Sequence, residues 1–336
     1  MAPRPAASGA PSKGASSADR LPYPQCPPLG RGYGRWFLHA EFWRPYAEAV
    51  AARHGLPAPG ALSAPEPGSH PVFRAAAGYF LKFYAPHWPL DAAAEADAYA
   101  ALGAGPALPV PALLAHGRLF AGGGRWPWPY LVTGALPGCS VGQLRAELQP
   151  ADLRQACRDL ALVVRALHRL PVPSAPSRGW RRRVADLQRS APERRRRDGW
   201  PEPLVLALPD YLDAALGSAG DIPRRLCHGD LTADHALLLP DGAAGWRLAG
   251  LLDFADAALA EAAYDLVALF SSLCAWDGEA LLAFLEAYGP DPAWRPGCRR
   301  RATAYLLLFP ADVLPRRLRT RTPEEIEAEL WPPGLP

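Results

Sequence analysis

Apolar residues recur at helical spacing in three stretches of the chain. Residues 36–54 carry an apolar stripe that includes Pro45, which predicts a helix that is kinked or restarted at the proline. Residues 90–102 show a second helical pattern, and residues 150–170 show the strongest one, which ends before Pro171. The chain is therefore expected to contain at least three helices that each bury one face.

Short apolar runs bounded by turn residues predict strands between and after these helices. The first two runs are joined by the small residues 76–78, and the last two flank Asp241 and Gly242, so each pair is typical of a hairpin. The N-terminal third is thus expected to form a small sheet with one main helix. The predicted strands cover residues 71–75, 79–84, 128–133, 236–239 and 246–252.

Composition narrows the class of protein. The chain has 336 residues, 49% hydrophobic and 21% charged, which is typical of a globular protein with two domains or lobes. A net charge of +3 does not argue for a nucleic acid or an anionic membrane as partner. No run approaches the roughly 18 uncharged apolar residues of a membrane helix, and the six cysteines form no CxxC pair. A soluble protein of the reducing cytoplasm is expected.

Residues 1–30 are rich in Pro, Ala, Ser and Gly and have few apolar anchors. This composition predicts a disordered N-terminal segment. A transit peptide is an alternative, since basic residues outnumber acidic ones there, but no amphipathic period supports it and no secretory apolar segment is visible.

Basic residues are distributed unevenly by type. Of the 36 basic residues 34 are Arg, and the two lysines are Lys13 and Lys82, so the one within the predicted sheet is expected to have a chemical role. Nine Arg fall within residues 178–200. A nucleic-acid patch is one interpretation of this run, but a solvated loop or helix face is favoured because no aromatic residue interleaves it.

The most informative stretch is residues 226–238 (LCHGDLTADHALL), a polar loop that runs into the second hairpin. The hairpin is followed by residues 251–256 (LLDFAD) and 263–266 (AYDL). A hairpin between Asp230 and Asp253 would bring both carboxylates to the same end. One carboxylate could then orient a hydroxyl nucleophile while the other holds a divalent cation.

The order and spacing of HGDL at 228–231, DF at 253–254 and YDL at 264–266 resemble the aminoglycoside phosphotransferase and choline kinase family. The resemblance spans about residues 62–275. It implies an α+β, bilobal protein-kinase-like fold, with a small N-terminal antiparallel sheet lobe carrying one main helix and a larger, mostly helical C-terminal lobe. The nucleotide-binding lobe is then expected at residues 31–135, and the catalytic and substrate-binding lobe at residues 136–336.

The resemblance also implies roles for particular residues. Asp230 matches the catalytic residue, and Asp253 matches a metal ligand. His235 falls where the family has Asn, its second metal ligand. An imidazole can bind a divalent cation, so Mg²⁺ is expected with Mn²⁺ as an alternative, and a structural, hydrogen-bonded role for His235 stays open. Ala255 replaces the usual Gly after Asp-Phe, which is tolerable if that backbone needs no positive φ.

Residues expected to bind the nucleotide, ATP, lie in the N-terminal third. Residues 68–74 (GSHPVFR), with Ser69, resemble the loop that covers the nucleotide. Lys82 matches the lysine that grips the phosphates, and Glu95 matches its ion-pair partner. Residues 130–138 (YLVTGALPG), with Thr133 and Ala135, resemble the segment whose backbone contacts adenine.

Three further residues are expected to be structural. His228 is expected to brace the loop through hydrogen bonds, and Asp265, at a helix N-terminus, to cap backbone amides and brace the same loop. His168 lies at the end of an apolar helix stripe, where a hydrogen-bonded core histidine is the default.

The implied activity is transfer of the γ-phosphate of ATP to a hydroxyl of a small molecule. Nine residues separate Phe254 from Tyr264, too few for a peptide-binding segment. An acidic run suggests a cleft for a cationic amine or amino sugar, with the hypothesised contributors Asp256, Glu261, Asp277 and Glu279. A catalytically inactive nucleotide-binding or ligand-binding protein is the alternative, because of His235. Antibiotic, amino alcohol, sugar and amino acid all stay open as acceptor, as does the oligomeric state.

Overall fold

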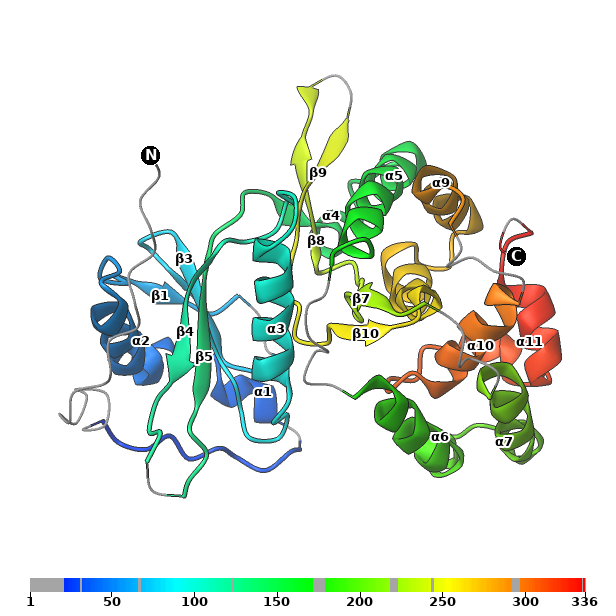
Figure 1. Cartoon of the computed structure of the whole chain (residues 1–336), viewed down its shortest axis with the longest axis horizontal. Coiled ribbons are helices and arrows are strands. Elements are labelled where there is room, and N and C mark those ends of the chain that lie inside the picture. The colour runs from blue at the N-terminus through cyan, green and yellow to red at the C-terminus, as the bar shows by residue number, and fades with distance from the viewer. Residues whose placement is uncertain are drawn as a thin grey trace. The chain divides into compact units, whose positions relative to one another are not determined.

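The computed structural model describes residues 21–30, 32–65, 68–122, 124–171, 179–217, 223–242, 245–291, 297–333 and 335. The chain divides into two compact units (Figure 1). Unit 1 draws its described residues from Met1–Pro89 and Leu113–Ala135, and unit 2 from Leu90–Ala112 and Leu136–Pro336. The helix expected at 90–102 thus belongs to the same compact unit as the C-terminal part of the chain.

Unit 1 is built on a five-stranded antiparallel sheet in the order β1-β2-β3-β5-β4. The hairpin predicted around residues 76–78 is confirmed, and Gly78 makes its turn with a φ of 88°. Strand β4 was not anticipated, because Gly117 interrupts its apolar pattern. A Cβ at Gly117 would meet the Tyr130 hydroxyl, so the glycine leaves room for that side chain of β5. The bounds are β1 Leu62–Ser63, β2 Val72–Ala75, β3 Tyr79–Phe83, β4 Leu113–Arg118 and β5 Pro129–Gly134.

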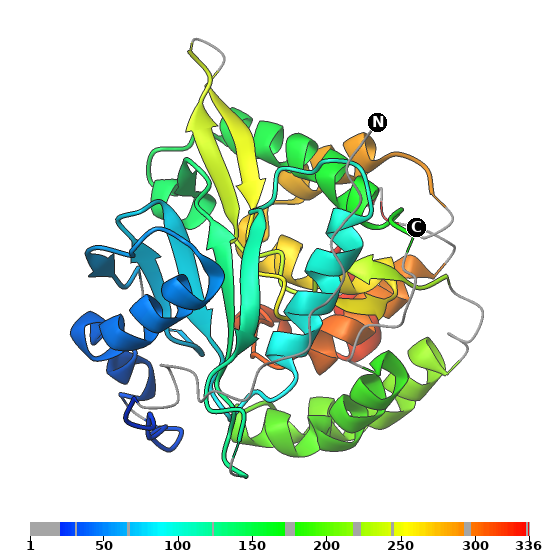
Figure 2. The ribbon, with the colours of Figure 1, turned by 60° about the vertical axis from the view of Figure 1, so that its left-hand side comes forward.

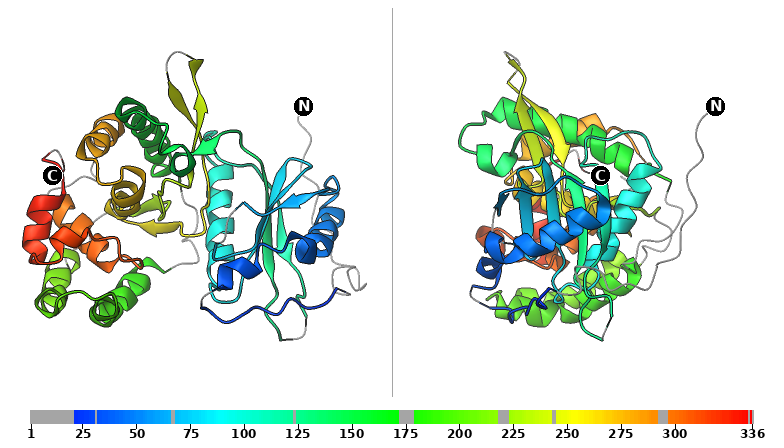
Figure 3. Two further views of the ribbon diagram at one scale, coloured as in Figure 1. Left: turned by 180° about the vertical axis from the view of Figure 1, so that it is seen from behind. Right: turned by 90° about the vertical axis from the view of Figure 1, so that its left-hand side faces the viewer.

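The helix α2, Ala40–His54, lies across one face of this sheet (Figure 3, right). It runs through Pro45 and follows the short helix α1, Tyr33–Trp36, so the predicted pattern from residue 36 covers two elements. Trp43 is fully buried and stacks on Phe83 of β3, with ring centroids 5.0 Å apart. Aromatic packing of this kind is the main contribution to the core of unit 1.

Residues 21–30 are held against unit 1 by their backbone carbonyls. The Tyr46 hydroxyl donates to Pro22 O at 2.6 Å, and the Trp128 indole N–H donates to Pro24 O at 3.2 Å. The expected disorder through residue 30 therefore does not apply to residues 21–30, while residues 1–20 lie outside the described part. The order of residues 21–30 could not be predicted from the sequence, because the donors that bind their backbone carbonyls lie far along the chain.

Unit 2 combines helices with two small antiparallel sheets, one of order β6-β8-β9 and one of order β10-β7. Helices α5 and α9 pack side by side (Figure 2). Among the described residues, no helix has the length and apolar character needed to span a bilayer. The helices are α3 Asp91–Gly103, α4 Val141–Leu144, α5 Pro150–Leu167, α6 Trp180–Arg197, α7 Glu202–Leu216, α8 Asp265–Ala268, α9 Gly278–Tyr288, α10 Cys298–Leu308 and α11 Pro323–Leu330. The strands are β6 Cys139–Ser140, β7 Arg225–Cys227, β8 Ala236–Pro240, β9 Trp246–Leu251 and β10 Ala258–Ala260.

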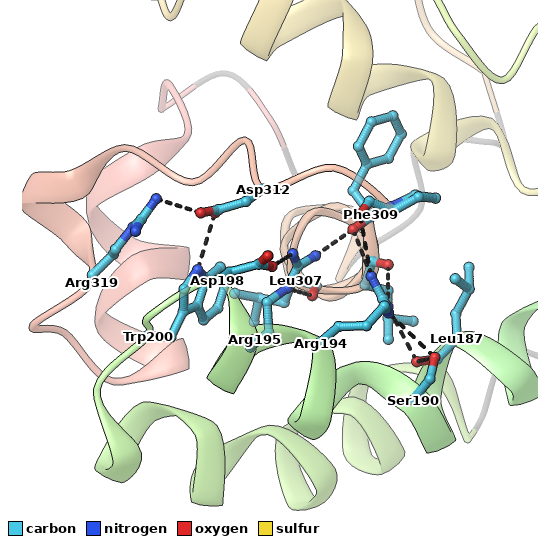
Figure 4. A network of polar contacts seen from close by, with 12 residues as sticks. Leu187, Ser190, Arg194, Arg195, Asp198, Trp200, Leu307, Phe309, Asp312 and Arg319 are labelled. Carbon is cyan, nitrogen blue, oxygen red and sulfur yellow. Dashed lines mark hydrogen bonds and ion pairs between the residues drawn. The ribbon is translucent and has the colours of Figure 1, made fainter. Parts of the chain in front are cut away.

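The arginine run of α6 divides into buried and exposed members. Arg195 is fully buried and donates to the carbonyls of Leu307 and Phe309 at the end of α10 (Figure 4). Arg194 donates to the carbonyls of Leu308 and Phe309 at 3.0 and 3.1 Å. These guanidinium groups satisfy carbonyls that α10 cannot bond internally and place positive charge at its negative end.

The other arginines of the run have separate positions. Arg196 pairs with Glu202 at 2.8 Å, and Arg197 is exposed. Arg178 lies outside the described residues. With Arg194 and Arg195 committed to α10, the run is part packing element and part solvated helix face, and the nucleic-acid interpretation loses its most concentrated segment.

Replacing Arg195 with Leu is expected to lower the free energy of unfolding by about 3 kcal/mol, because the α10 carbonyls would lose buried charged donors. The matched control is Arg197→Leu, which removes an exposed charge from the same run and should change the value by less than about 0.5 kcal/mol. Urea unfolding followed by circular dichroism measures both. Equal effects of the two variants would contradict the capping role.

Candidate active site

The Asp265 carboxylate organises the loop at residues 228–235. It accepts the backbone N–H of His228 at 3.0 Å and of Gly229 at 2.7 Å. His168, at the end of α5, contacts the same carboxylate through Nε2 at 3.0 Å and the Tyr288 hydroxyl through Nδ1 at 3.0 Å. The structural roles predicted for Asp265 and His168 are confirmed, and the carboxylate serves the loop instead of capping its own helix.

The buried His228 ring makes two hydrogen bonds to backbone groups. Its Nε2 lies 2.8 Å from Leu252 O, which can only accept, and its Nδ1 accepts the Asp230 N–H at 3.2 Å. The ring is therefore the neutral Nε2–H tautomer. Complete burial, assisted by nearby His235, lowers the pKa of His228 to about 4. The bracing role predicted for His228 is confirmed, and it links the start of the loop to the end of β9.

Gly229 is required by both conformation and space. Its φ is 84°, and a Cβ there would collide with the backbone carbonyl of Asp256. The segment after Asp253 is thus pressed directly onto the 228–235 loop. Only glycine permits this approach.

His235 lies between the two carboxylates named by the sequence. Its Nδ1 is 2.9 Å from the backbone carbonyl of Asp230 and 3.5 Å from that residue's carboxylate, and its Nε2 is 3.9 Å from Asp253 Oδ2. A carbonyl oxygen only accepts, so Nδ1 carries a proton, and Nε2 is the ring nitrogen that faces Asp253. The predicted hairpin, β8 with β9, brings Asp230 and Asp253 together as expected.

These atoms fit a divalent cation. Nε2 of His235 and Oδ2 of Asp253 lie 3.9 Å apart, and both are atoms that can coordinate a cation placed between them. The alternatives left open for His235 are compatible, since one ring nitrogen is hydrogen-bonded and the other is directed at a carboxylate. Asp253 itself has a φ of 60°, and its carboxylate accepts the Ala255 N–H at 3.1 Å. The positive φ therefore falls on Asp253 and not on Ala255, which explains why alanine is tolerated there.

Asp230 lies in an unusual electrostatic environment. Burial is the largest cause that raises its pKa, to about 6, and the carboxylates of Asp256, Asp253 and Asp265 add to the rise while His235 opposes it. A carboxyl with this pKa is ionised at neutral pH and is a stronger base than an ordinary aspartate. That is the property expected of a proton acceptor.

The hypothesised acidic cleft is partly wrong. Glu261 is buried and bonded to the Arg301 guanidinium and the Tyr305 hydroxyl, and Asp277 caps the N-terminus of α9. Glu279 is exposed in the first turn of α9. Asp256 has a side chain that is 39% exposed and lies close enough to Asp230 to raise its pKa. The run looked like one surface because the sequence does not reveal which acids have buried partners.

Arg183 was missed by the sequence analysis. It extends from α6 and donates to Asp256 Oδ1 at 3.2 Å and to the Tyr264 hydroxyl at 3.4 Å. It thereby fixes the carboxylate beside Asp230. No local signal separates this arginine from its exposed neighbours in the same run.

Glu95 lies on α3 in unit 2 and is buried. Burial is the main cause that raises the pKa of Tyr99, and the carboxylates of Glu95 and Asp253 raise it further. The Tyr99 ring lies edge-on to the Phe254 ring, with ring centroids 5.8 Å apart. The structure thus brings Glu95 and Asp253 to the same tyrosine.

The other residues predicted to bind the nucleotide lie in unit 1. Lys82, on β3, is half-buried, with its ammonium 5.4 Å from the centre of the Tyr84 ring. Ser69 is exposed in a bend and its carbonyl accepts from Tyr33. Thr133, in β5, pairs with Phe80 of β3. The Ala135 N–H donates to Gly78 O at 3.1 Å.

The sequence and the fold both match known proteins. A model of the phosphotransferase enzyme family matches residues 64–298. The chain belongs to this phosphotransferase family. The matched range contains the 228–235 loop, Asp253 and Lys82.

Two relatives of this chain come from Streptomyces. The aminoglycoside 3′-phosphotransferase of Streptomyces fradiae is 32% identical over 174 residues, covering 48% of this chain and 61% of that protein. The streptomycin 3″-kinase of Streptomyces griseus is 32% identical over 181 residues, covering 48% of this chain and 63% of that protein. The chain therefore spans about three fifths of the length of these relatives.

Solved structures confirm the α+β, protein-kinase-like fold of this family member. The GDP and kanamycin complex of APH(2″)-IIIa superposes with a TM-score of 0.61 at 16% identity, over 79% of this chain and 88% of that one. An aminoglycoside phosphotransferase from Streptomyces rimosus, in complex with ADP and streptomycin, gives a TM-score of 0.52 at 25% identity, over 70% of this chain and 88% of that one.

Replacing Gly229 with Ala is expected to displace the loop and to lower the free energy of unfolding by more than about 2 kcal/mol. Gly78→Ala is the matched control, since Gly78 has a similar φ of 88° but open space around a Cβ. It should cost only about 1 kcal/mol. Denaturant unfolding measures both, and similar values for the two variants would argue against the close contact with Asp256.

The low pKa of His228 predicts a pH-dependent stability difference. The folded pKa of about 4 lies below the ordinary value of 6.5, so the unfolded chain binds the extra proton first. The contribution of His228 is therefore complete above pH 6.5 and is lost as the pH falls towards 4. The raised pKa of Asp230 acts in the opposite direction, so the wild type is compared with His228→Asn. The difference in unfolding free energy between the wild type and His228→Asn should decrease by up to about 1.4 kcal/mol for each unit by which the pH falls in this window. A difference that stays constant with pH would contradict the prediction.

Proposed function

We propose that this protein transfers the γ-phosphoryl group of ATP to a hydroxyl of a small, cationic acceptor. The observation that carries the proposal is the arrangement of Asp230, His235 and Asp253 on one braced loop and hairpin. The names of the two Streptomyces relatives, both acting on aminoglycosides, support an acceptor of this class. So does the short segment between Phe254 and Tyr264, which leaves no room for a peptide-binding loop.

Asp230 orients the acceptor hydroxyl and takes its proton as the acceptor oxygen bonds to the γ-phosphorus. The bond from that phosphorus to the bridging oxygen breaks, and the electron pair leaves with the nucleoside diphosphate. Asp230 is ionised at neutral pH, because its pKa of about 6 lies below 7. Positioning and charge neutralisation then account for most of the rate enhancement.

Asp253 and His235 would hold the divalent cation, which supplies charge neutralisation at the phosphates. Mg²⁺ prefers oxygen ligands, whereas an imidazole nitrogen suits Mn²⁺ better. We therefore infer that the protein uses Mg²⁺ and that Mn²⁺ supports it at least as well.

The nucleotide-binding role is assigned to residues of unit 1 together with Glu95. Lys82 grips the phosphates and Glu95 is its ion-pair partner, while Ser69 belongs to the loop that covers the nucleotide. Thr133 and Ala135 contact adenine through their backbone. Since the Ala135 N–H is already bonded to Gly78 O, its carbonyl is the group offered to the base.

Asp256 is the residue we assign to the cationic part of the acceptor. Its carboxylate is 39% exposed, lies near Asp230 and is held in place by Arg183. A side chain fixed in this way can receive an ammonium or guanidinium group close to the reacting hydroxyl.

The test measures metal-dependent ATP turnover with streptomycin and kanamycin as candidate acceptors. Asp230→Asn should reduce kcat by about 10²- to 10⁴-fold, and Lys82→Ala and Asp253→Asn should weaken turnover and nucleotide binding. Asp186→Asn, an exposed acid on α6 paired with Arg189, is the charge-matched control and should leave turnover unchanged. Nucleotide binding without transfer to any hydroxylated amine would favour the inactive binding protein. Turnover that survives Asp230→Asn would overturn the assignment.

The cation assignment has its own comparison. Replacing His235 with Asn removes the nitrogen donor and should shift the ratio of Mn²⁺ to Mg²⁺ affinity towards Mg²⁺, measured by calorimetry in the presence of a non-hydrolysable ATP analogue. An unchanged ratio would assign His235 to hydrogen bonding alone.

A further inference from the structure

A five-residue π-helix, Leu269–Leu273, follows α8 in unit 2. The wider turn is stabilised by Arg145, whose guanidinium donates to the carbonyls of Ser272 and Leu273 at 2.8 and 2.9 Å. Single turns of this kind are rare and are frequently found at functional sites. This π-helix contacts the 228–235 loop through Ser272.

The side chain of Ser272 reaches that loop. Its Oγ accepts the backbone N–H of Ala233 at 3.1 Å, and Ala233 is buried. The carbonyl of Ala233 accepts the Gly142 N–H at 3.0 Å. A Cβ at Gly142 would meet the end of the Asp234 side chain, so Gly142 and Asp234 lie close together. Both backbone polar groups of Ala233, in the middle of the loop, are therefore hydrogen-bonded to residues that are distant in the sequence.

Ala233 lies between Asp230 and His235, so its position sets how those two residues are placed relative to each other. We propose that Ser272 is a positioning residue that fixes this spacing through the Ala233 amide. The inference rests on the proposed function, since Asp230 and His235 are the groups it positions. In this role Ser272 acts through the loop backbone, by its hydrogen bond to the Ala233 N–H.

The adjacent serine provides a matched control. Ser271 is partly exposed like Ser272, but its hydroxyl donates to Val267 O at 2.7 Å within the same helical segment and does not reach the loop. Ser271→Ala and Ser272→Ala therefore remove the same atom from neighbouring positions. Only the second leaves a buried backbone N–H without the acceptor described here.

The experiment compares steady-state turnover and hydrogen exchange in Ser272→Ala, Ser272→Thr and Ser271→Ala. Ser272→Ala is expected to lower kcat about tenfold, which corresponds to about 1.4 kcal/mol, while the KM for ATP changes less than about twofold. Ser272→Thr keeps a hydroxyl and should restore most of kcat, and Ser271→Ala should behave as wild type. The Ala233 amide should exchange faster in Ser272→Ala alone.

The outcomes separate this inference from the proposed function. Without any wild-type turnover the proposed function fails, yet faster exchange at Ala233 in Ser272→Ala would still support the loop contact. If the wild type is active and Ser272→Ala matches Ser271→Ala in both kcat and exchange, the inference is overturned. A thermal midpoint for each variant identifies unfolding. If Ser272→Ala does not fold, Ser272→Gly takes its place: a lower kcat with faster exchange at Ala233 supports the role, and a fully wild-type Ser272→Gly variant contradicts it.

Discussion

The acceptance of two loop amides by one buried carboxylate is the constraint on which the site depends. Asp265 binds the N–H groups of His228 and Gly229, and it is held in turn by His168. A buried backbone N–H without an acceptor lowers the stability of the fold, and the Asp265 carboxylate supplies the acceptor for both N–H groups. It therefore fixes the start of the loop. Asp230, the next residue, inherits its position from that bond network.

The loop is then fixed again at its middle and at its end. Ser272 and Gly142 hold the peptide groups around Ala233, and the carbonyl of Asp230 bonds to the ring of His235. These contacts come from elements that are distant in the chain. A rigid support of this kind suits a reaction in which positioning, and not covalent chemistry, supplies most of the rate enhancement.

The same electrostatic principle appears away from the site. Arg195 is buried at the end of α10 and neutralises carbonyl charge that the helix leaves unpaired. Glu261 is buried against Arg301, and Arg183 is held by Asp256. In each case a charge that looks like surface in the sequence has a specific partner. Several of the arginines thus serve packing in this protein, because the guanidinium can satisfy several acceptors at once.

Family membership, the two hairpins, the helices α2, α3 and α5 and the proximity of Asp230 and Asp253 could be predicted from the amino-acid sequence. These features are local: they follow from periodicity, turn residues and a motif whose members are close in the chain. Strand β4, the packing of residues 21–30, the roles of Arg183 and Ser272, and the burial of Glu261 were decided only by the tertiary structure. Each depends on a partner far away along the chain, and no local pattern records which donor will meet which acceptor once the chain has folded.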